Sequence, residues 1–170
     1  MLKKLHRFCL SAVLAASILG ISSPNPTQAE DALPKIRQDV VYGHKDGMAL
    51  TMDVFEPESN RKGIGLLFMV SGGWVSTWMP PAQMAGFFKP LLDEGYTVIA
   101  VRHGSSPKYN IPEIVEDVRK ALQHVDLNAE TWKIDKKKLG VFGFSAGGHL
   151  SLMLDRKSTR LNSSHTVISY

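Results

Sequence analysis

The order of apolar and polar residues along the chain predicts strands that alternate with helices. Ile64 to Val70 and Tyr96 to Val101 are short apolar runs without alternation, which is typical of strands buried on both faces of a parallel sheet. Between them, Pro81 to Leu92 is compatible with a helix that stops before Gly95. A third apolar run, Leu139 to Phe144, follows a second helical stretch. We therefore predict the α/β class, with right-handed crossovers, a mostly parallel sheet and helices on both of its faces.

The second helical stretch has a well-marked start. Asn110 and Glu113 have the spacing of a capping box, and Pro112 suits the first turn of a helix. The acids Glu113, Glu116 and Asp117 favour the positive end of the helix dipole. Apolar residues then recur on one helical face, namely Ile114, Val118, Ala121, Leu122 and Val125. The pattern predicts an amphipathic helix that begins after Asn110.

A hairpin is predicted before these elements. Val40 to Gly43 and Met48 to Phe55 read as two strands around a turn that contains Asp46 and Gly47. In the second strand, apolar positions alternate with Thr51 and Asp53, so we expect a half-exposed hairpin at the edge of the sheet. Pro57 lacks the amide that a ladder requires and is expected to end the second strand.

The segment Gly143-Phe144-Ser145-Ala146-Gly147 is a G-x-S-x-G pattern that links the third apolar run to a helical pattern of Leu150, Met153 and Leu154. A serine at the tip of a sharp turn from strand to helix leaves no room for side chains two residues before and after it, where this sequence has glycine. We therefore predict that Ser145 is an exposed nucleophile. The alternative is a structural serine in a glycine-rich turn.

The N-terminal segment, residues 1–29, has the layout of a secretory signal peptide. Three basic residues precede an apolar stretch from Phe8 to Ile21, and small and polar residues lead to a cleavage site before Glu30. We expect a secreted or periplasmic protein without a membrane anchor after cleavage, and the alternative is a retained anchor. Cys9, the only cysteine, lies in this segment, so the mature part is expected to contain no disulfide.

The C-terminal segment, residues 156–170, abandons the helical period and the apolar content of the preceding stretch. It resembles a translated sequencing adapter, so we predict a non-native tail and a natural sequence that breaks off soon after Leu154. The alternative is a genuine polar tail. Residues 30–155 then form a partial domain.

The charge balance changes when both end segments are set aside. The whole chain has a net charge of +4, but residues 30–155 hold 14 basic and 16 acidic residues, a net charge of −2. A short lysine run, residues 136–138, is more typical of a solvated turn than of a phosphate-binding patch, so we expect no nucleic-acid partner. The sequence also lacks a metal-ligand cluster, a phosphate loop and a dinucleotide fingerprint, and we expect no cofactor.

Three features resemble the α/β-hydrolase family, particularly its secreted esterase and lipase branch related to hormone-sensitive lipase. They are the loop Ser71-Gly72-Gly73-Trp74, the helix from Pro112 to Leu122, and the segment from Gly143 to Leu150. The resemblance covers roughly residues 40–154. It implies the N-terminal half of an α/β-hydrolase fold, so we expect a protein truncated at its C-terminus.

The resemblance also implies a chemistry. Ser145 would attack the carbonyl of a small ester to form an acyl-enzyme, with the oxyanion held by the amide of Ala146 and by an amide of Gly72 or Gly73. The loop departs from the His-Gly-Gly-Gly form of the family, because Val70 and Ser71 stand where histidine and glycine are usual. Which amide of this loop donates is therefore open.

The acid and the histidine of the family's triad follow the serine in the chain, but only 25 residues follow Ser145. We expect His149 to have a packing role, His165 to lie in the non-native tail, and His44 and His103 to have solvent-exposed or turn roles. Other groups have simpler alternatives: Trp74, Trp78 and Met79 either wall an acyl pocket or pack beneath the loop, and Ser105 and Ser106 are turn residues.

The predicted activity of the full-length protein is carboxylic ester hydrolysis. One alternative is that this chain is an inactive truncated fragment or a non-catalytic binding module. Another is a peptidase of the same fold. The oligomeric state and the acyl and alcohol specificity cannot be predicted from these residues.

Overall fold

A computed structural model describes residues 34–158 and 166–167 of the 170-residue chain. The chain divides into two compact units, and all described residues belong to the second, Ala32–Tyr170. The predicted signal peptide lies outside the described residues, as do residues 159–165 and 168–170 of the predicted tail. Both predictions about the ends of the chain therefore stay predictions.

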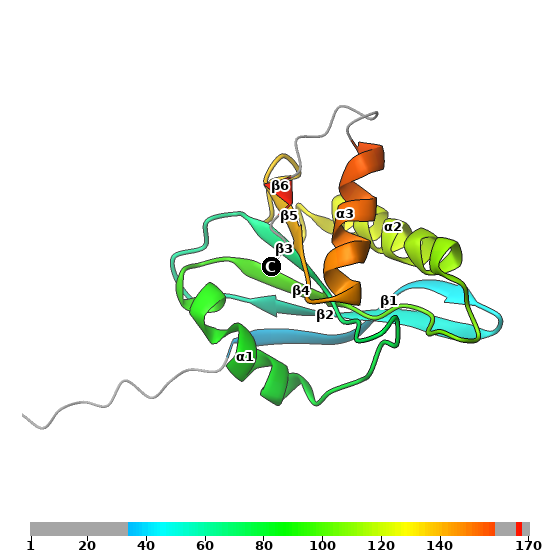
Figure 1. Cartoon of the computed structure of the whole chain (residues 1–170). Coiled ribbons are helices and arrows are strands. Elements are labelled where there is room, and N and C mark those ends of the chain that lie inside the picture. Colours follow the sequence, from blue (N-terminus) through cyan, green and yellow to red (C-terminus); the bar gives the residue numbers. More distant parts are fainter. Residues whose placement is uncertain (1–33, 159–165, 168–170) are drawn as a thin grey trace, which may run out of the picture. The chain divides into compact units, whose positions relative to one another are not determined.

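The described part of the second unit is a mixed sheet with helices on both faces (Figure 1). Its elements are β1 (Lys35–Lys45), β2 (Met48–Glu56), β3 (Gly65–Met69), α1 (Pro81–Asp93), β4 (Thr97–Val101), α2 (Ile111–Asn128), β5 (Leu139–Phe142), α3 (Ala146–Ser158) and β6 (Thr166–Val167). The strand order is β1-β2-β4-β3-β5-β6. The pairs β1 with β2 and β2 with β4 are antiparallel, and the remaining pairs are parallel. The predicted α/β class with a mostly parallel sheet is confirmed.

Strand β4 shows how the two layers of the core form, because all five of its residues are buried. Val98 and Ala100 belong to the cluster of apolar side chains under α1, whereas Ile99 and Val101 belong to the cluster under α2 and α3. Successive side chains of a strand point to opposite faces, so an uninterrupted apolar run is what a doubly covered strand requires. The prediction from the pattern of residues 96–101 is confirmed.

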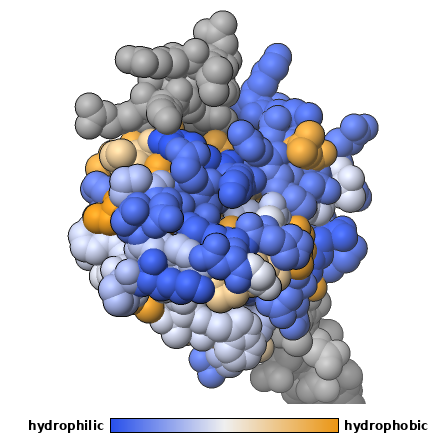
Figure 2. All heavy atoms as spheres, turned by 90° about the vertical axis from the view of Figure 1, so that its right-hand side faces the viewer, coloured by the Kyte–Doolittle hydropathy of each residue, from blue (hydrophilic) through white to orange (hydrophobic). Residues whose placement is uncertain are grey.

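Helix α2 forms where the capping pattern predicts it. The Asn110 side chain accepts the Glu113 amide at 3.0 Å, and the Glu113 carboxylate accepts the Asn110 amide at 2.8 Å. The predicted apolar face turns inward, with Ile114 and Val118 fully buried. The side of the molecule that lies on the right in Figure 1, where α2 and the hairpin end, has a mainly hydrophilic surface (Figure 2). The helix is therefore amphipathic, as expected from its spacing.

The hairpin is confirmed at the edge of the sheet, but β2 is not half exposed. Asp53, which the alternating pattern places on the solvent side, is only 1% exposed. Its carboxylate pairs with the Arg102 guanidinium, with Nη2 3.0 Å from Oδ1, and it also accepts the Asp39 amide at 2.8 Å. A buried carboxylate is tolerated when a charged partner and hydrogen bonds replace its water. The prediction of a solvated face was wrong because the partner of Asp53 is Arg102, which lies 49 residues away in sequence and is not part of the local alternating pattern.

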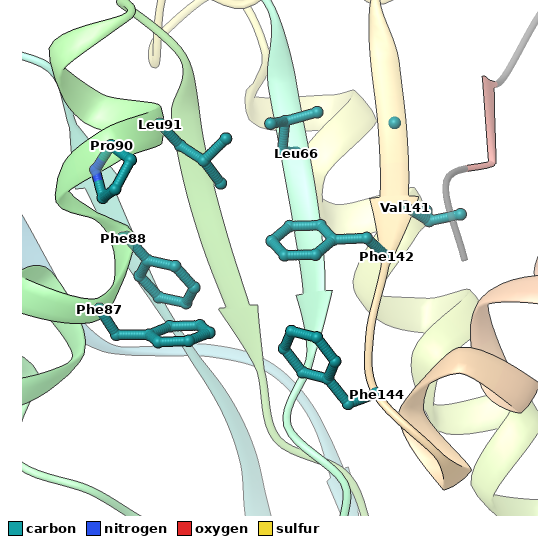
Figure 3. A pocket seen from close by; sticks show the side chains of 9 residues that line it. Leu66, Phe87, Phe88, Pro90, Leu91, Val141, Phe142 and Phe144 are labelled. Atoms are coloured by element: carbon teal, nitrogen blue, oxygen red, sulfur yellow. The ribbon is translucent and has the colours of Figure 1, made fainter. Parts of the chain in front are cut away.

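The face of the sheet that carries α1 is only partly covered within the described residues. Helix α1 contacts β2 and β4, and beside it an apolar groove of about 360 Å³ opens over β3 and β5 (Figure 3). Its lining includes Phe87, Phe142 and Phe144, whose rings lie 5.0 to 6.0 Å from the ring centroid of Phe68. Phe144, predicted to continue the buried strand, is 49% exposed on this groove. Figure 3 shows Phe87 and Phe144 pointing toward each other from α1 and from the end of β5.

Candidate active site

Ser145 lies at the tip of a sharp turn between β5 and α3. Strand β5 ends at Phe142, α3 begins at Ala146, and Ser145 is solvent-exposed with φ +52°. This left-handed conformation is uncommon for a residue with a side chain, and strain of this kind concentrates at functional sites. The predicted setting of strand, turn and helix is confirmed.

The glycines on either side of Ser145 have no room for a side chain. A Cβ atom on Gly147 would lie 2.6 Å from the carbonyl oxygen of Met69, at the end of β3. A Cβ atom on Gly143 would lie 2.6 Å from the carbonyl carbon of Gly147 itself. The steric requirement read from the sequence is therefore confirmed. The structure adds that the requirement for glycine at position 147 comes from β3, on which the turn packs.

The loop after β3 folds into a tight turn next to this serine. The amides and carbonyls of Gly72 and Val75 bond each other reciprocally, at 2.9 and 3.0 Å. Gly73 and Trp74 between them have φ +58° and +61°, and positive φ at both central residues is characteristic of a type I′ turn. Because β3 and β5 are parallel neighbours, both loops leave the same edge of the sheet. The Trp74 ring lies edge-to-face on the ring of His149 in α3, with a centroid distance of 6.0 Å.

The turn distinguishes the two glycines that the sequence left as alternatives. The Gly72 amide already donates to Val75, whereas the Gly73 amide has no hydrogen-bond partner within the described residues. Ala146 is the first residue of α3, and amides in the first turn of a helix lack an intrahelical partner. Two backbone amides are thus available: that of Ala146, which follows the exposed Ser145 directly, and that of Gly73, in the loop that leaves the same edge of the sheet.

No described histidine donates to or accepts from the Ser145 hydroxyl. His149 packs its ring on Trp74, as expected for a packing role, although its side chain is exposed. His44 is exposed near the end of β1, whereas His103 is buried in the loop after β4, so that of its two expected roles, solvent-exposed or turn, only the second fits. His165 lies outside the described residues. The general base is therefore not assigned to a described residue.

The aromatic residues of the loop separate into two groups. Trp74 is partly buried against the larger apolar cluster, so packing is what the structure supports for its side chain. Trp78 and Met79 remain 56% and 42% exposed and do not line the groove under α1. An acyl pocket walled by these side chains is not formed by the described residues.

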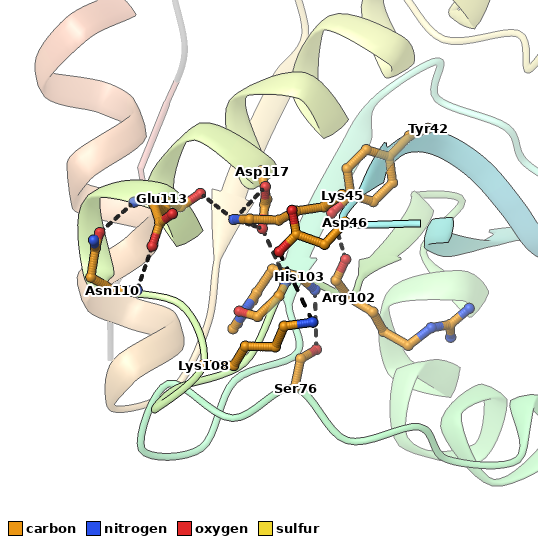
Figure 4. Close-up of polar contacts among 11 residues, drawn as sticks. Tyr42, Lys45, Asp46, Ser76, Arg102, His103, Lys108, Asn110, Glu113 and Asp117 are labelled. Carbon is orange, nitrogen blue, oxygen red and sulfur yellow. Dashed lines mark hydrogen bonds and ion pairs between the residues drawn. The ribbon is translucent and has the colours of Figure 1, made fainter. Parts of the chain in front are cut away.

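A buried acid anchors the loop that follows β4. Asp117 is 1% exposed, and its carboxylate accepts the Gly104 amide at 3.0 Å and the Lys45 ammonium at 3.0 and 3.1 Å (Figure 4). Lys45 also lies over the Tyr109 ring, 4.1 Å from its centroid. We expected Asp117 to serve the helix dipole, but its side chain points inward to this network. Its position one helical turn from Ile114 and Ala121, on the apolar face, was the available signal.

His103 belongs to the same loop and is buried in its neutral form. Its Nδ1 lies 2.7 Å from the Gly104 carbonyl oxygen, and its Nε2 has no hydrogen-bond partner within the described residues. Burial lowers the pKa of His103, and this effect outweighs the hydrogen bond to Gly104 and the Asp117 charge, which act in the opposite direction; the Lys45 charge also lowers it. The imidazole thus resists protonation while the protein is folded.

Acidification is expected to destabilise the fold through this histidine. Because its pKa in the folded protein lies below the ordinary value of 6.5, the unfolded protein binds the proton first as the pH falls. The contribution of His103 to the free energy of unfolding is complete above pH 6.5 and decreases below it, by at most about 1.4 kcal/mol per pH unit. Urea unfolding between pH 7.5 and 5 should show this slope. His103→Asn, which cannot bind this proton, should reduce it. His124, whose pKa is also lowered by burial, adds a slope of the same sign. An unchanged slope in His103→Asn would contradict the assignment.

The described residues offer neither a metal site nor a membrane span. In residues 34–158 and 166–167, no group of three or more His, Cys, Asp or Glu side chains could hold a metal ion. Within the same ranges, no helix is long and apolar enough to cross a bilayer. The chemistry that these residues support is nucleophilic attack by Ser145 beside two available amides.

Comparisons with known proteins identify the family and agree with the fold. The BD-FAE family model matches residues 52–168. The chain is 30% identical over 115 residues to the probable carboxylic ester hydrolase LipM of Mycobacterium tuberculosis, an alignment that covers 66% of this chain and 26% of LipM. Among solved structures, an arylesterase superposes with a TM-score of 0.63 at 25% identity, covering 80% of this chain and 44% of that one. A truncated carbohydrate esterase from gut microbiota superposes with a TM-score of 0.61 at 30% identity, covering 72% and 44%. The chain thus spans less than half the length of these proteins.

Proposed function

The chain belongs to the BD-FAE family, a hormone-sensitive-lipase-like family of α/β-hydrolases, and from this premise we propose that the whole protein cleaves carboxylic esters through an acyl-enzyme on Ser145. The family predicted from the three sequence features is confirmed by the family match, and the predicted fold by the esterase structures. Ester hydrolysis is the activity named for the relatives. The catalytic route and the activity of this protein are our proposal.

The observation that carries the proposal is the exposed Ser145 at φ +52°, followed directly by the available amide of Ala146, with the available amide of Gly73 in the loop at the same edge of the sheet. In the proposed reaction, Ser145 Oγ forms a bond to the ester carbonyl carbon and gives its proton to a base. The carbonyl oxygen becomes an oxyanion that accepts hydrogen bonds from the two amides. Collapse of this intermediate breaks the ester C–O bond, and the leaving oxygen takes the proton back from the base to depart as the alcohol. Water then gives a proton to the base, attacks the acyl carbon and releases the acid, and the base returns the proton to Ser145 Oγ. The Gly72 amide takes the role of closing the turn rather than binding the oxyanion.

We propose a small-molecule ester as the substrate, and a secreted or periplasmic location on the basis of the signal-peptide pattern in residues 1–29. The proposal names neither the acyl group nor the alcohol, because Trp78 and Met79, the predicted walls of an acyl pocket, are exposed.

A fluorophosphonate probe tests the proposed nucleophile directly. Such probes phosphonylate an activated serine hydroxyl, so we expect one adduct per molecule of the whole, folded protein, on the peptide that contains Ser145. Peptide mass spectrometry locates the adduct, and heat-unfolded protein is the control that should remain unlabelled. An adduct on another serine, or none in a preparation that hydrolyses p-nitrophenyl acetate, would remove Ser145 from the mechanism.

A further inference from the structure

The type I′ turn that presents the Gly73 amide is held from outside by the loop after β4. The Ser106 amide donates to the Trp74 carbonyl at 3.0 Å. Immediately after the turn, the Ser76 amide donates to Ser105 Oγ at 3.0 Å. The His103 amide donates to Ser76 Oγ at 3.3 Å (Figure 4). The turn and the residue that follows it are therefore held by three hydrogen bonds, and all of these partners come from residues 103–106.

The two serines form what we term the serine clasp, Ser76 and Ser105. Each hydroxyl accepts a hydrogen bond from a backbone amide of the other loop. The two loops are therefore joined by a pair of hydrogen bonds, one donated from each side. A hydroxyl that accepts from a backbone amide restricts that amide in both distance and direction. The clasp therefore restrains the backbone directly after the turn, where a small rotation would redirect the Gly73 amide.

The loop that supplies Ser105 is itself anchored to rigid elements. The Gly104 amide donates to Asp117 of α2, which also binds Lys45 of β1. Gly104 also packs closely on these elements, because a Cβ atom there would lie 2.6 Å from the Tyr109 ring and 3.0 Å from the Asp117 carboxylate, which leaves no room for a side chain. The restraint on the turn thus runs through the loop to a buried charge pair between α2 and β1, and does not depend on the turn alone.

We infer that Ser76 and Ser105 are positioning residues, whose clasp directs the Gly73 amide toward the oxyanion of the reaction. This inference rests on the proposed function. The clasp does not touch the substrate, so removing it should weaken binding of the transition state more than binding of the ground state, and kcat should fall while KM changes little. Loss of an oxyanion donor costs about 100- to 1000-fold, and a displacement of about 1 Å costs up to about 100-fold, so we expect a fall in kcat of about 10- to 100-fold.

Steady-state kinetics of the whole protein on p-nitrophenyl acetate tests the clasp. Ser105→Ala should lower kcat by about 10- to 100-fold with KM within about twofold. Ser105→Thr, which keeps the accepting hydroxyl, should restore most of the loss. Ser59→Ala, in the exposed loop after β2, is the matched control and should behave as the parent protein. A merely structural serine would lower activity only in proportion to the folded fraction, so kcat calculated per active site titrated with the fluorophosphonate probe would equal that of the unaltered protein, whereas loss of the clasp lowers this normalised kcat.

Two further measurements keep the inference testable if Ser105→Ala folds poorly. Ser76→Ala removes only the 3.3 Å bond from His103 and should show the same split with a smaller fall in kcat. Amide hydrogen exchange of residues 73–76 should be faster in either variant and needs no turnover. A kcat within about twofold of the parent together with unchanged exchange would overturn the clasp. Failure of the proposed function is a separate result, because then the probe does not label Ser145 in the unaltered protein.

Discussion

Replacing Ser145 with alanine is expected to lower ester turnover by the whole protein about a million-fold, to the level left by binding and the oxyanion amides. The reason is the loss of the covalent route, because alanine has no atom that can form the acyl-enzyme. The measurement is the hydrolysis of p-nitrophenyl acetate at substrate concentrations above KM, together with loss of fluorophosphonate labelling. Activity that survives within about a factor of ten would mean that another group attacks the ester.

The same position allows function to be separated from folding. Ser145 has φ +52°, a conformation that glycine adopts without the steric cost that a Cβ carries. Ser145→Gly should therefore be as inactive as Ser145→Ala and yet more stable than the parent, by about 1 kcal/mol. Urea unfolding of the three proteins measures the difference. Equal stability of Ser145→Gly and the parent would show that the turn stores no strain at this residue.

Replacing Gly147 with alanine is expected to destabilise the protein by about 3 kcal/mol and to inactivate it. The added Cβ would lie 2.6 Å from the Met69 carbonyl oxygen, so either the first turn of α3 or the end of β3 must move. Both are backbone, and neither can yield as a flexible side chain would. The movement would carry Ser145 and the Ala146 amide away from Gly73, so activity should be lost even in the fraction that remains folded.

The control for this prediction is a glycine in open space. Gly86 lies in the middle of α1, and a Cβ atom there would have no neighbour within 4 Å. Gly86→Ala should therefore raise the free energy of unfolding by about 1 kcal/mol, as alanine is favoured over glycine inside a helix. Thermal and urea unfolding of both variants make the comparison. A Gly147→Ala protein with the stability of the parent would contradict the steric account of the turn.

Local patterns in the sequence were sufficient for much of this molecule. The capping box at Asn110 and Glu113, the buried strand β4 and the turn at Ser145 were predicted from residues within a few positions of each other, and each is confirmed. These features depend on contacts over one helical turn or on the alternation of a single strand. Such contacts form between residues that are close in sequence, and so the residue order alone describes them.

Predictions that concerned polar side chains were less successful. Asp53 was expected on a solvated face and Asp117 at the end of a helix, and both are buried. The charged partner that replaces water is remote in sequence for both acids: it is Arg102 for Asp53 and Lys45 for Asp117. A charged residue in an amphipathic pattern is assigned to solvent by default, because the pattern contains no information about a distant partner.

By itself, the sequence determined the order of strands and helices from β1 to α3 and predicted the nucleophilic serine, because apolar periodicity and the steric rule at Gly143 and Gly147 act over short distances along the backbone. The family followed from the resemblance of three sequence motifs. Only the tertiary structure decided which loop amide is available at the site. The Gly72 amide closes the turn, the Gly73 amide is left without a partner in the described residues, and Ser105, which lies 29 residues beyond Ser76, holds the turn in place. Hydrogen bonds between loops depend on how β3 and β4 are brought together in the sheet, and this arrangement exists only once the protein has folded.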